Sequence, residues 1–189
     1  MDTYKVGYLV GSIAKASINR KLAYALAKLA PGELELKEIP IVDLPMYSYD
    51  YDKDYPGVAR MFKQAIEDAD ALLVVTPEYN RSIPGVLKNA IDWASRPWGD
   101  NSFTHKPTGV IGTSPGAIGT AVAQQHLRGI LNYCNAPLMN DVEAYIQFKP
   151  DMIDAEGNVA VDDTKEFLAK YMREYADFVQ RMRKILPPE

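Results

Sequence analysis

The sequence has few residues that could build a metal centre or a disulfide-bonded fold. Its 189 residues contain one cysteine, Cys134, and two histidines, His105 and His126. A single cysteine cannot form an internal disulfide, and neither histidine has partners at ligand spacing. We therefore expect no disulfide framework, no metal site and a reducing, cytoplasmic environment. Cys134 is expected to be buried and unreactive, and the histidines to make surface hydrogen bonds.

Long apolar runs and clusters of basic residues are also missing. No stretch reaches the roughly 18 apolar residues of a membrane span, and no basic leader or cleavage pattern precedes the first apolar segment. The 21 Lys and Arg residues are spread along the chain against 25 Asp and Glu, a net charge of −4. We therefore expect an untargeted protein that neither inserts into membranes nor binds nucleic acid.

What the sequence does contain is enough apolar residues, 47%, for one sizeable core. Its length suits a single domain over residues 1–189. Apolar patterns predict strands at 4–10, 34–36, 71–76 and 108–113, with a less regular fifth strand around 138–146. They predict helices at 18–29, 58–69, 84–94, 121–133 and 167–182.

The order of these elements predicts an α/β fold. The segment 71–76 is hydrophobic almost throughout, which is typical of a parallel strand buried on both faces. In the segment 34–36, apolar and charged residues alternate, as they do in a half-buried edge strand. Right-handed crossovers then give a three-layer, doubly wound sandwich around a parallel five-stranded sheet, with the strand order 2-1-3-4-5.

In such sheets ligands bind beyond the carboxyl ends of the strands, where the strand order reverses. The loops at that place are 11–17, 77–83 and 114–119. The segment 39–55 is long and rich in Tyr, Asp and Pro, and its apolar residues follow neither the two-residue period of a strand nor the 3.6-residue period of a helix. It is expected to form a wall of a site or a subunit interface, and a disordered surface loop is the alternative.

The first loop has the composition of an anion site. Gly11, Ser12, Ser17 and Asn19 place small hydroxyl and amide groups just before a helix, whose free N–H groups favour a phosphate. The loop is neither a dinucleotide Gly-x-Gly-x-x-Gly motif nor a Walker loop. Taken alone, Ser17 or Asn19 is more simply read as a helix cap.

The second loop contains Pro77, Glu78, Tyr79 and Asn80 directly after the buried third strand. Its backbone amides and aromatic ring could contact a planar heterocycle. Taken one at a time, Glu78 is more simply a solvated carboxylate and Tyr79 a half-buried aromatic.

Over nearly its whole length the sequence resembles the NADPH-dependent FMN reductases, a flavodoxin-like family that includes quinone, azo-dye and chromate reductases. The motifs that carry the resemblance are Gly11-Ser12 with Ser17 and Asn19, Thr76 to Asn80, Ser82 to Gly85, Leu87 to Trp93, and the loop Ser114 to Gly119.

The resemblance implies a site for flavin mononucleotide (FMN). In the first loop, Ser12, Ser17 and Asn19 would hold the phosphate, together with Gly11, Lys15 and Ile18. Pro77, Glu78, Tyr79 and Asn80 would contact the isoalloxazine ring, and Ser114 and Gly116 would approach it from the third loop. Relatives often carry arginine at the position of Ala14, so Lys15 would compensate only weakly and binding would be weaker than usual.

No catalytic side chain is expected, because flavin N5 itself accepts the hydride. Lys88, Asn89, Asp92 and Trp93 are expected to pack the helix that follows the second loop and to fix that loop in place.

The resemblance implies an FMN-dependent NAD(P)H oxidoreductase with ping-pong kinetics. Its acceptor would be a quinone or a similar small molecule, such as an azo dye, a nitroaromatic, chromate or free flavin, and the protein would be a homodimer or homotetramer. One alternative is a flavodoxin-type single-electron carrier, although such carriers are usually far more acidic than this chain. Another is a non-catalytic interaction protein that has lost its flavin.

Overall fold

The computed structural model describes residues 3–186, which form one parallel sheet flanked by helices. The strands are β1 (Tyr4–Val10), β2 (Leu34–Glu38), β3 (Ala71–Val75), β4 (Thr108–Ser114) and β5 (Tyr145–Gln147). The helices are α1 (Ile18–Leu29), α2 (Gly57–Glu67), α3 (Gly85–Ala94), α4 (Ala121–Tyr133) and α5 (Asp162–Ile185), and a short 3₁₀ helix, η1, covers Tyr49–Tyr51.

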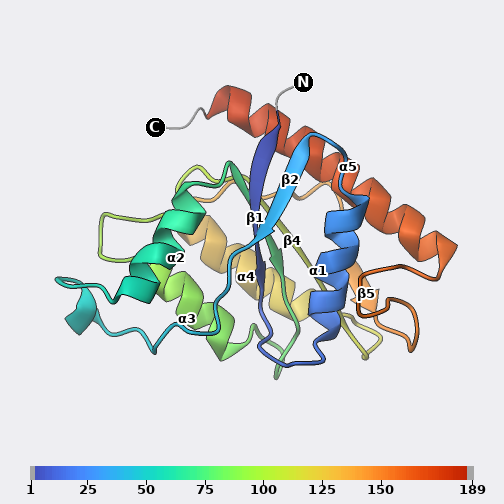
Figure 1. Cartoon of the computed structure of the whole chain (residues 1–189), viewed down its shortest axis with the longest axis horizontal. Helices are drawn as coiled ribbons and strands as arrows, with labels where there is room; N and C mark the ends of the chain where they lie inside the picture. The colour runs from blue at the N-terminus through green and yellow to red at the C-terminus, as the bar shows by residue number, and fades with distance from the viewer. Residues whose placement is uncertain (1–2, 187–189) are drawn as a thin grey trace.

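The order of the strands in the sheet is β2-β1-β3-β4-β5, and all the pairings are parallel. This order confirms the predicted flavodoxin-like topology. Because β1 pairs with β2 on one side and β3 on the other, the strand order reverses between β1 and β3. The loops that follow β1, β3 and β4 lie together at the lower end of the sheet (Figure 1).

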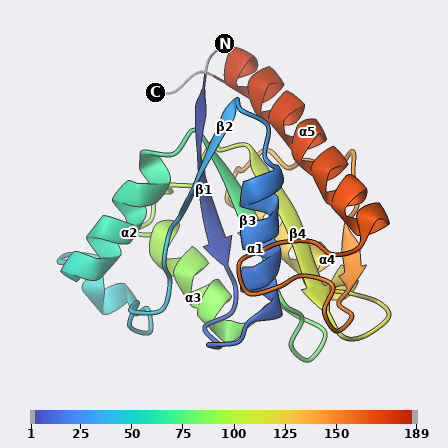
Figure 2. The same ribbon diagram turned by 45° about the vertical axis from the view of Figure 1, so that its right-hand side comes forward.

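Helices cover both faces of the sheet (Figure 2). All five residues of β3 are buried, and their side chains alternate between two cores. Leu73 and Val75 pack in the core with α1 and α5, whereas Leu72 and Val74 pack in the core with α2, α3 and α4. The apolar run therefore has the buried parallel environment that its composition predicts.

The last helix is fixed to the sheet by two buried tyrosines. Tyr171 donates a hydrogen bond to the carbonyl of Val110 on β4 (3.1 Å), and Tyr175 donates one to the carbonyl of Leu72 on β3 (2.6 Å). Burial raises the pKa of both hydroxyls, so they stay protonated donors. These bonds set the position of α5 across the two central strands.

The predicted fifth strand, 138–146, is wrong in its extent. The strand covers only Tyr145–Gln147, and Leu138 forms an isolated bridge with β4. Between them the chain leaves the sheet, because the Arg128 guanidinium of α4 donates to the carbonyl of Met139 at 2.8 Å. A side chain thus takes a backbone acceptor that a continuous strand would offer to its neighbour.

Helix α5 is longer than its apolar positions at 167–182 indicate. Asp162 and Asp163 lie in its first turn, and Arg183 and Lys184 lie in its last. These charges complement the helix dipole and extend the helix beyond its apolar stripe. Among residues 3–186, no helix combines the length and apolar character needed to cross a membrane.

Candidate functional site

The loop after β1 is built around the start of α1. Ser17 is the N-cap of the helix, and its hydroxyl oxygen accepts a hydrogen bond from the Arg20 amide at 3.3 Å. The capping interpretation is therefore confirmed. A hydroxyl that accepts one bond still has its own proton to donate, so capping leaves Ser17 able to bind an anion.

The same loop presents free backbone donors. Within residues 3–186, the N–H groups of residues 15, 16, 18 and 19 donate no hydrogen bond. Ser12 is buried at the beginning of the loop, where its hydroxyl accepts from the Ala14 amide at 3.4 Å. Ala14 and Lys15 are exposed. Unpaired amides at a helix N-terminus are the donors that a phosphate requires.

The side chain of Asn19 is fully engaged within the protein. Its amide nitrogen donates to the Thr113 carbonyl at 2.9 Å, and its amide oxygen accepts from the Thr113 N–H at 3.0 Å. Asn19 is 1% exposed. It therefore fixes the first turn of α1 to the end of β4, and only its backbone N–H remains free for a ligand.

Glu78 ties the loop after β3 to the start of α4. Its carboxylate accepts from the Ala123 amide at 3.0 Å and pairs with Arg81 at 3.0 Å. The Glu78 side chain is 7% exposed, so it is not the solvated carboxylate of the simpler interpretation. An acidic group in the first turn of a helix satisfies a free donor and complements the helix dipole.

A tight turn follows Glu78. The amides and carbonyls of Tyr79 and Ser82 pair reciprocally at 2.9 and 3.0 Å. Asn80 and Arg81 between them have φ values of 51° and 63°, which is the left-handed pattern of a type I′ turn. The turn leaves the Tyr79 ring 52% exposed at the edge of the loop.

The loop after β4 is closed by its first residue. The Ser114 hydroxyl donates to the Gly119 carbonyl at 2.6 Å, and its oxygen accepts from the Gly116 amide at 3.2 Å. Gly116 is exposed, and the nearest heavy atom to a Cβ built there is 3.5 Å away. The backbone at Gly116 is therefore open to close approach by a ligand.

Each of the three loops exposes a large apolar side chain. Ile13, Tyr79 and Ile118 are 55%, 52% and 50% exposed. They come from the loops after β1, β3 and β4, which share one edge of the sheet. The edge thus combines an anion site with apolar surface, a combination that suits a flat ligand carrying a phosphate.

The segment 39–55 is packed against α3 and is not a disordered loop. The Pro45 carbonyl accepts from the Asn89 amide at 2.9 Å and from the Trp93 indole at 2.6 Å. The Asn89 oxygen accepts from the Tyr47 amide at 2.8 Å. The tyrosines that surround the Trp93 ring are Tyr47, Tyr51 and Tyr55.

These contacts correct one expectation. Asn89 and Trp93 do pack their helix, but their polar groups hold the segment 39–55 and not the loop 77–83. Lys88 and Asp92 form an exposed ion pair with each other, at 2.7 Å. The loop 77–83 is held by Glu78 instead.

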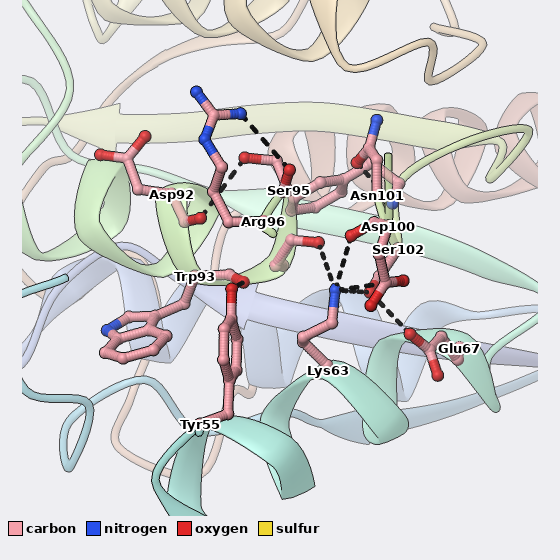
Figure 3. A network of polar contacts seen from close by, with 12 residues as sticks. Tyr55, Lys63, Glu67, Asp92, Trp93, Ser95, Arg96, Asp100, Asn101 and Ser102 are labelled. Atoms are coloured by element: carbon pink, nitrogen blue, oxygen red, sulfur yellow. Dashed lines mark hydrogen bonds and ion pairs between the residues drawn. The ribbon is translucent and has the colours of Figure 1, made fainter. Parts of the chain in front are cut away.

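A buried lysine fixes the far end of α3 (Figure 3). Lys63 of α2 is 7% exposed, and its ammonium donates to the carbonyls of Ala94 and Asp100 and to the Ser102 hydroxyl. Ser102 in turn donates to Glu67 at 2.8 Å. Burial lowers the pKa of Lys63, and these acceptors compensate for its lost hydration.

His126 lies on α4 and Cys134 at its C-terminal end, and His126 contacts the second loop through Ser82. His126 and Ser82 are joined by a hydrogen bond of 3.1 Å at a groove of about 540 Å³ between α3 and α4, so the hydrogen-bonding role predicted for His126 is confirmed. Cys134 is buried, which raises the pKa of its thiol.

The positions of Lys63 and the Arg20–Glu38 ion pair were not indicated by sequence patterns. Lys63 follows the apolar Phe62, but a lysine beside an apolar stripe is normally exposed. Its partners lie more than thirty residues away along the chain. Glu38 and Arg20 lie in different elements, so helical spacing could not reveal their pairing.

Comparisons with known proteins show the family to which the chain belongs. A sequence model of the NADPH-dependent FMN reductases matches residues 4–151. A 2-hydroxy-1,4-benzoquinone reductase from a Burkholderia species is 54% identical over 179 residues, which cover 95% of this chain and 98% of the relative. A quinone reductase of Pseudomonas putida is 43% identical over 185 residues, 97% of this chain and 99% of the relative.

A solved structure extends the likeness to three dimensions. The flavoenzyme NAD(P)H:(acceptor) oxidoreductase FerB from Paracoccus denitrificans superimposes with a TM-score of 0.91 at 44% identity. The match covers 95% of this chain and 99% of that one.

The contact between Glu78 and α4 gives a stability prediction. Replacing Glu78 with alanine leaves the Ala123 amide without its acceptor, and we expect the free energy of unfolding to fall by about 1–2 kcal/mol. Glu78→Gln is the matched control, since it keeps an acceptor oxygen and loses only the charge, so its loss should be smaller. Urea denaturation measures both, and equal stability of wild type and Glu78→Ala would contradict the capping role.

Proposed function

The chain belongs to the NADPH-dependent FMN reductase family, and from that premise we propose that it transfers electrons from NAD(P)H to quinones by means of bound FMN. The observation that carries the proposal is the shared edge of the sheet, where unpaired helix amides lie beside apolar side chains from all three loops. The quinone as acceptor is supported by the names of the relatives, at up to 54% identity.

The phosphate end of FMN fits the loop after β1. The free N–H groups of this loop and the Ser17 hydroxyl would donate to it, with Ser12 at the base of the loop and Gly11 and Ile18 at its ends. The Ala14 side chain supplies no charge there, so Lys15 is the nearby cation that the loop itself offers. Asn19 contributes its backbone and holds the loop in place.

The ring end of FMN fits the other two loops. Pro77, Glu78, Tyr79 and Asn80 would border the isoalloxazine, with Glu78 acting as a positioning residue through α4. Tyr79 and Asn80 would supply hydrogen-bond donors to the part of the ring where negative charge develops on reduction. Ser114 shapes the third loop, so that Gly116 leaves its backbone open to the ring.

When bound, FMN supplies hydride acceptance and donation at N5, and the protein provides binding and orientation. We expect the segment 39–55 to form a wall of the acceptor pocket, on which Met46 and Tyr49 are 77% and 78% exposed. We expect one face of the bound ring to stay open, so that donor and acceptor would bind there in turn with ping-pong kinetics. The same openness suits azo dyes, nitroaromatics, chromate and free flavin as further acceptors.

A direct assay tests this function. The purified protein should be yellow with FMN, NADPH should bleach it in the absence of oxygen, and a quinone should restore the colour. A stopped-flow comparison of NADPH with NADH then gives the donor preference. The proposal fails if the protein binds neither FMN nor NADPH, and bound FMN that neither donor bleaches would indicate a single-electron carrier.

The phosphate site has its own test in Ser17→Asp. Aspartate is as good an N-cap as serine, so the fold should be retained. The added carboxylate would lie beside the phosphate, and repulsion should weaken FMN affinity by more than about tenfold. Ser17→Asn is the matched control, because it also caps the helix but adds no charge. Unchanged affinity of Ser17→Asp, measured by flavin titration, would place the phosphate elsewhere.

We also propose that the protein is a homodimer or homotetramer and that it works in the cytoplasm. The surface at the ends of α3 and α4 carries Trp98 and Tyr133, which are 78% and 71% exposed, and Arg96 lies against the Trp98 ring. Trp, Tyr and Arg are the residues that most often dominate binding energy in interfaces. This surface borders the groove between α3 and α4.

The oligomer prediction can be tested at Gly129, which lines the groove on α4 and has open space where a Cβ would stand, with no atom within 4 Å. Gly129→Arg should shift the protein to a monomer in sedimentation velocity, because a charged side chain would fill the groove. Gly57→Arg at the start of α2 is equally free of contacts and serves as the control. An assembly unchanged by Gly129→Arg would exclude this surface.

A further inference from the structure

A pocket of about 410 Å³ lies on the opposite side of the first loop from the ring-binding loops. Val10, Ser12 and Ile13 line one side, residues 38–42 line the other, and Arg20 of α1 closes it. Since β2 and β3 flank β1 on opposite sides, the pocket lies at the carboxyl end of β2. It shares Ser12 and Ile13 with the loop assigned to the FMN phosphate.

An ion pair lies in this pocket. Arg20 donates to the Glu38 carboxylate, and the two side chains are 30% and 26% exposed, so both can still contact a ligand. Burial, together with the charge of Glu38, raises the pKa of nearby Tyr8 to about 12. Burial by itself would lower the pKa of Arg20, but Glu38 raises it, so the guanidinium stays charged.

The chemistry of the pair matches the ribose of an adenine nucleotide. In the Rossmann dinucleotide-binding fold, which is also a doubly wound α/β sheet, an acidic residue after the first βα unit accepts hydrogen bonds from the ribose hydroxyls of NAD, and a nearby arginine accommodates the 2′-phosphate of NADP. Here the acid and the arginine occupy one pocket. A guanidinium can exchange a carboxylate for a phosphate, because it binds both through the same planar donors.

The walls of the pocket suit an adenine base. Ile39 and Ile41 are buried at its floor, whereas Ile13 and Val42 are 55% and 57% exposed at its rim. The pocket is also within reach of the flavin. Two strand spacings, roughly 10 Å, separate the end of β2 from the end of β3. A dinucleotide consists of two nucleotides joined end to end, so it can extend over this distance.

We propose that this pocket binds the adenosine end of the dinucleotide donor, and that the Arg20–Glu38 pair sets the choice between NADH and NADPH. The inference rests on the proposed function, because it assumes a nicotinamide donor. Glu38 accepts hydrogen bonds from the ribose hydroxyls of NADH. With NADPH, the 2′-phosphate replaces Glu38 as the partner of Arg20. The intact pair therefore admits both donors.

Two substitutions should shift the preference in opposite directions. Glu38→Gln removes the negative charge that opposes a 2′-phosphate, and should tighten binding of 2′,5′-ADP relative to ADP at least tenfold. Arg20→Gln should weaken binding of 2′,5′-ADP at least tenfold and change ADP binding little. The exposed neighbours provide matched controls, Glu35→Gln and Lys37→Gln, which should leave the ratio unchanged.

The measurement is isothermal titration of each protein, as purified, with 2′,5′-ADP and with ADP. The ratio of kcat/KM for NADPH and NADH should follow the same order. Circular dichroism and FMN content show that each variant is folded. Opposite shifts in Glu38→Gln and Arg20→Gln support the inference, and an unchanged affinity ratio in both overturns it.

Other results also decide the question. If Arg20→Gln weakens FMN binding and leaves the nucleotide ratio unchanged, Arg20 serves the flavin phosphate and the inference is overturned. If FMN binds and quinones are reduced, but the ratio of affinities for 2′,5′-ADP and ADP is the same in both variants as in the wild type, the inference fails and the proposed function stands. If the wild type binds no FMN, the proposed function fails, and the nucleotide titration still reports on the pocket.

Discussion

The two hydrogen bonds between the Asn19 side chain and the backbone of Thr113 are the constraint on which the candidate site depends. They join residues 94 positions apart and fix the first turn of α1 against the end of β4. Because the free amides of the first loop belong to that turn and to the residues just before it, their position relative to the third loop is set within the protein. Such preorganisation reduces the ordering cost that a bound ligand would otherwise meet.

The same principle recurs in the second loop and in the support of α3. Glu78 joins the second loop to α4, and Lys63 joins α2 to the end of α3, in both cases through buried side chains bonded to backbone atoms. Each bond satisfies a polar group that folding removes from water. The site is thus held by polar contacts between elements, while the apolar cores set the distance of the helices from the sheet.

The helix and strand layers of the fold can be predicted from the sequence, because the spacing of apolar residues shows which side of each element is buried. The apolar run 71–76 and the helical stripes give β3 and the positions of the helices, and the strand order follows from the crossovers. The pairing of Asn19 with Thr113 and of Glu78 with Ala123 could not be predicted, since each joins distant segments. The fifth strand was overestimated because Arg128 competes for a strand carbonyl. The ring contacts proposed for Tyr79 and Asn80 rest on family resemblance, and spacing alone would place these residues in an ordinary turn.

The attachment of the segment 39–55 has an evolutionary consequence. Asn89 and Trp93 both donate hydrogen bonds to the backbone carbonyl of Pro45. A backbone carbonyl is present whatever side chain its residue carries. The exposed side chains of Met46 and Tyr49 can therefore diverge without loosening the anchor. The surface of this segment can thus change in evolution while its backbone stays bound to α3.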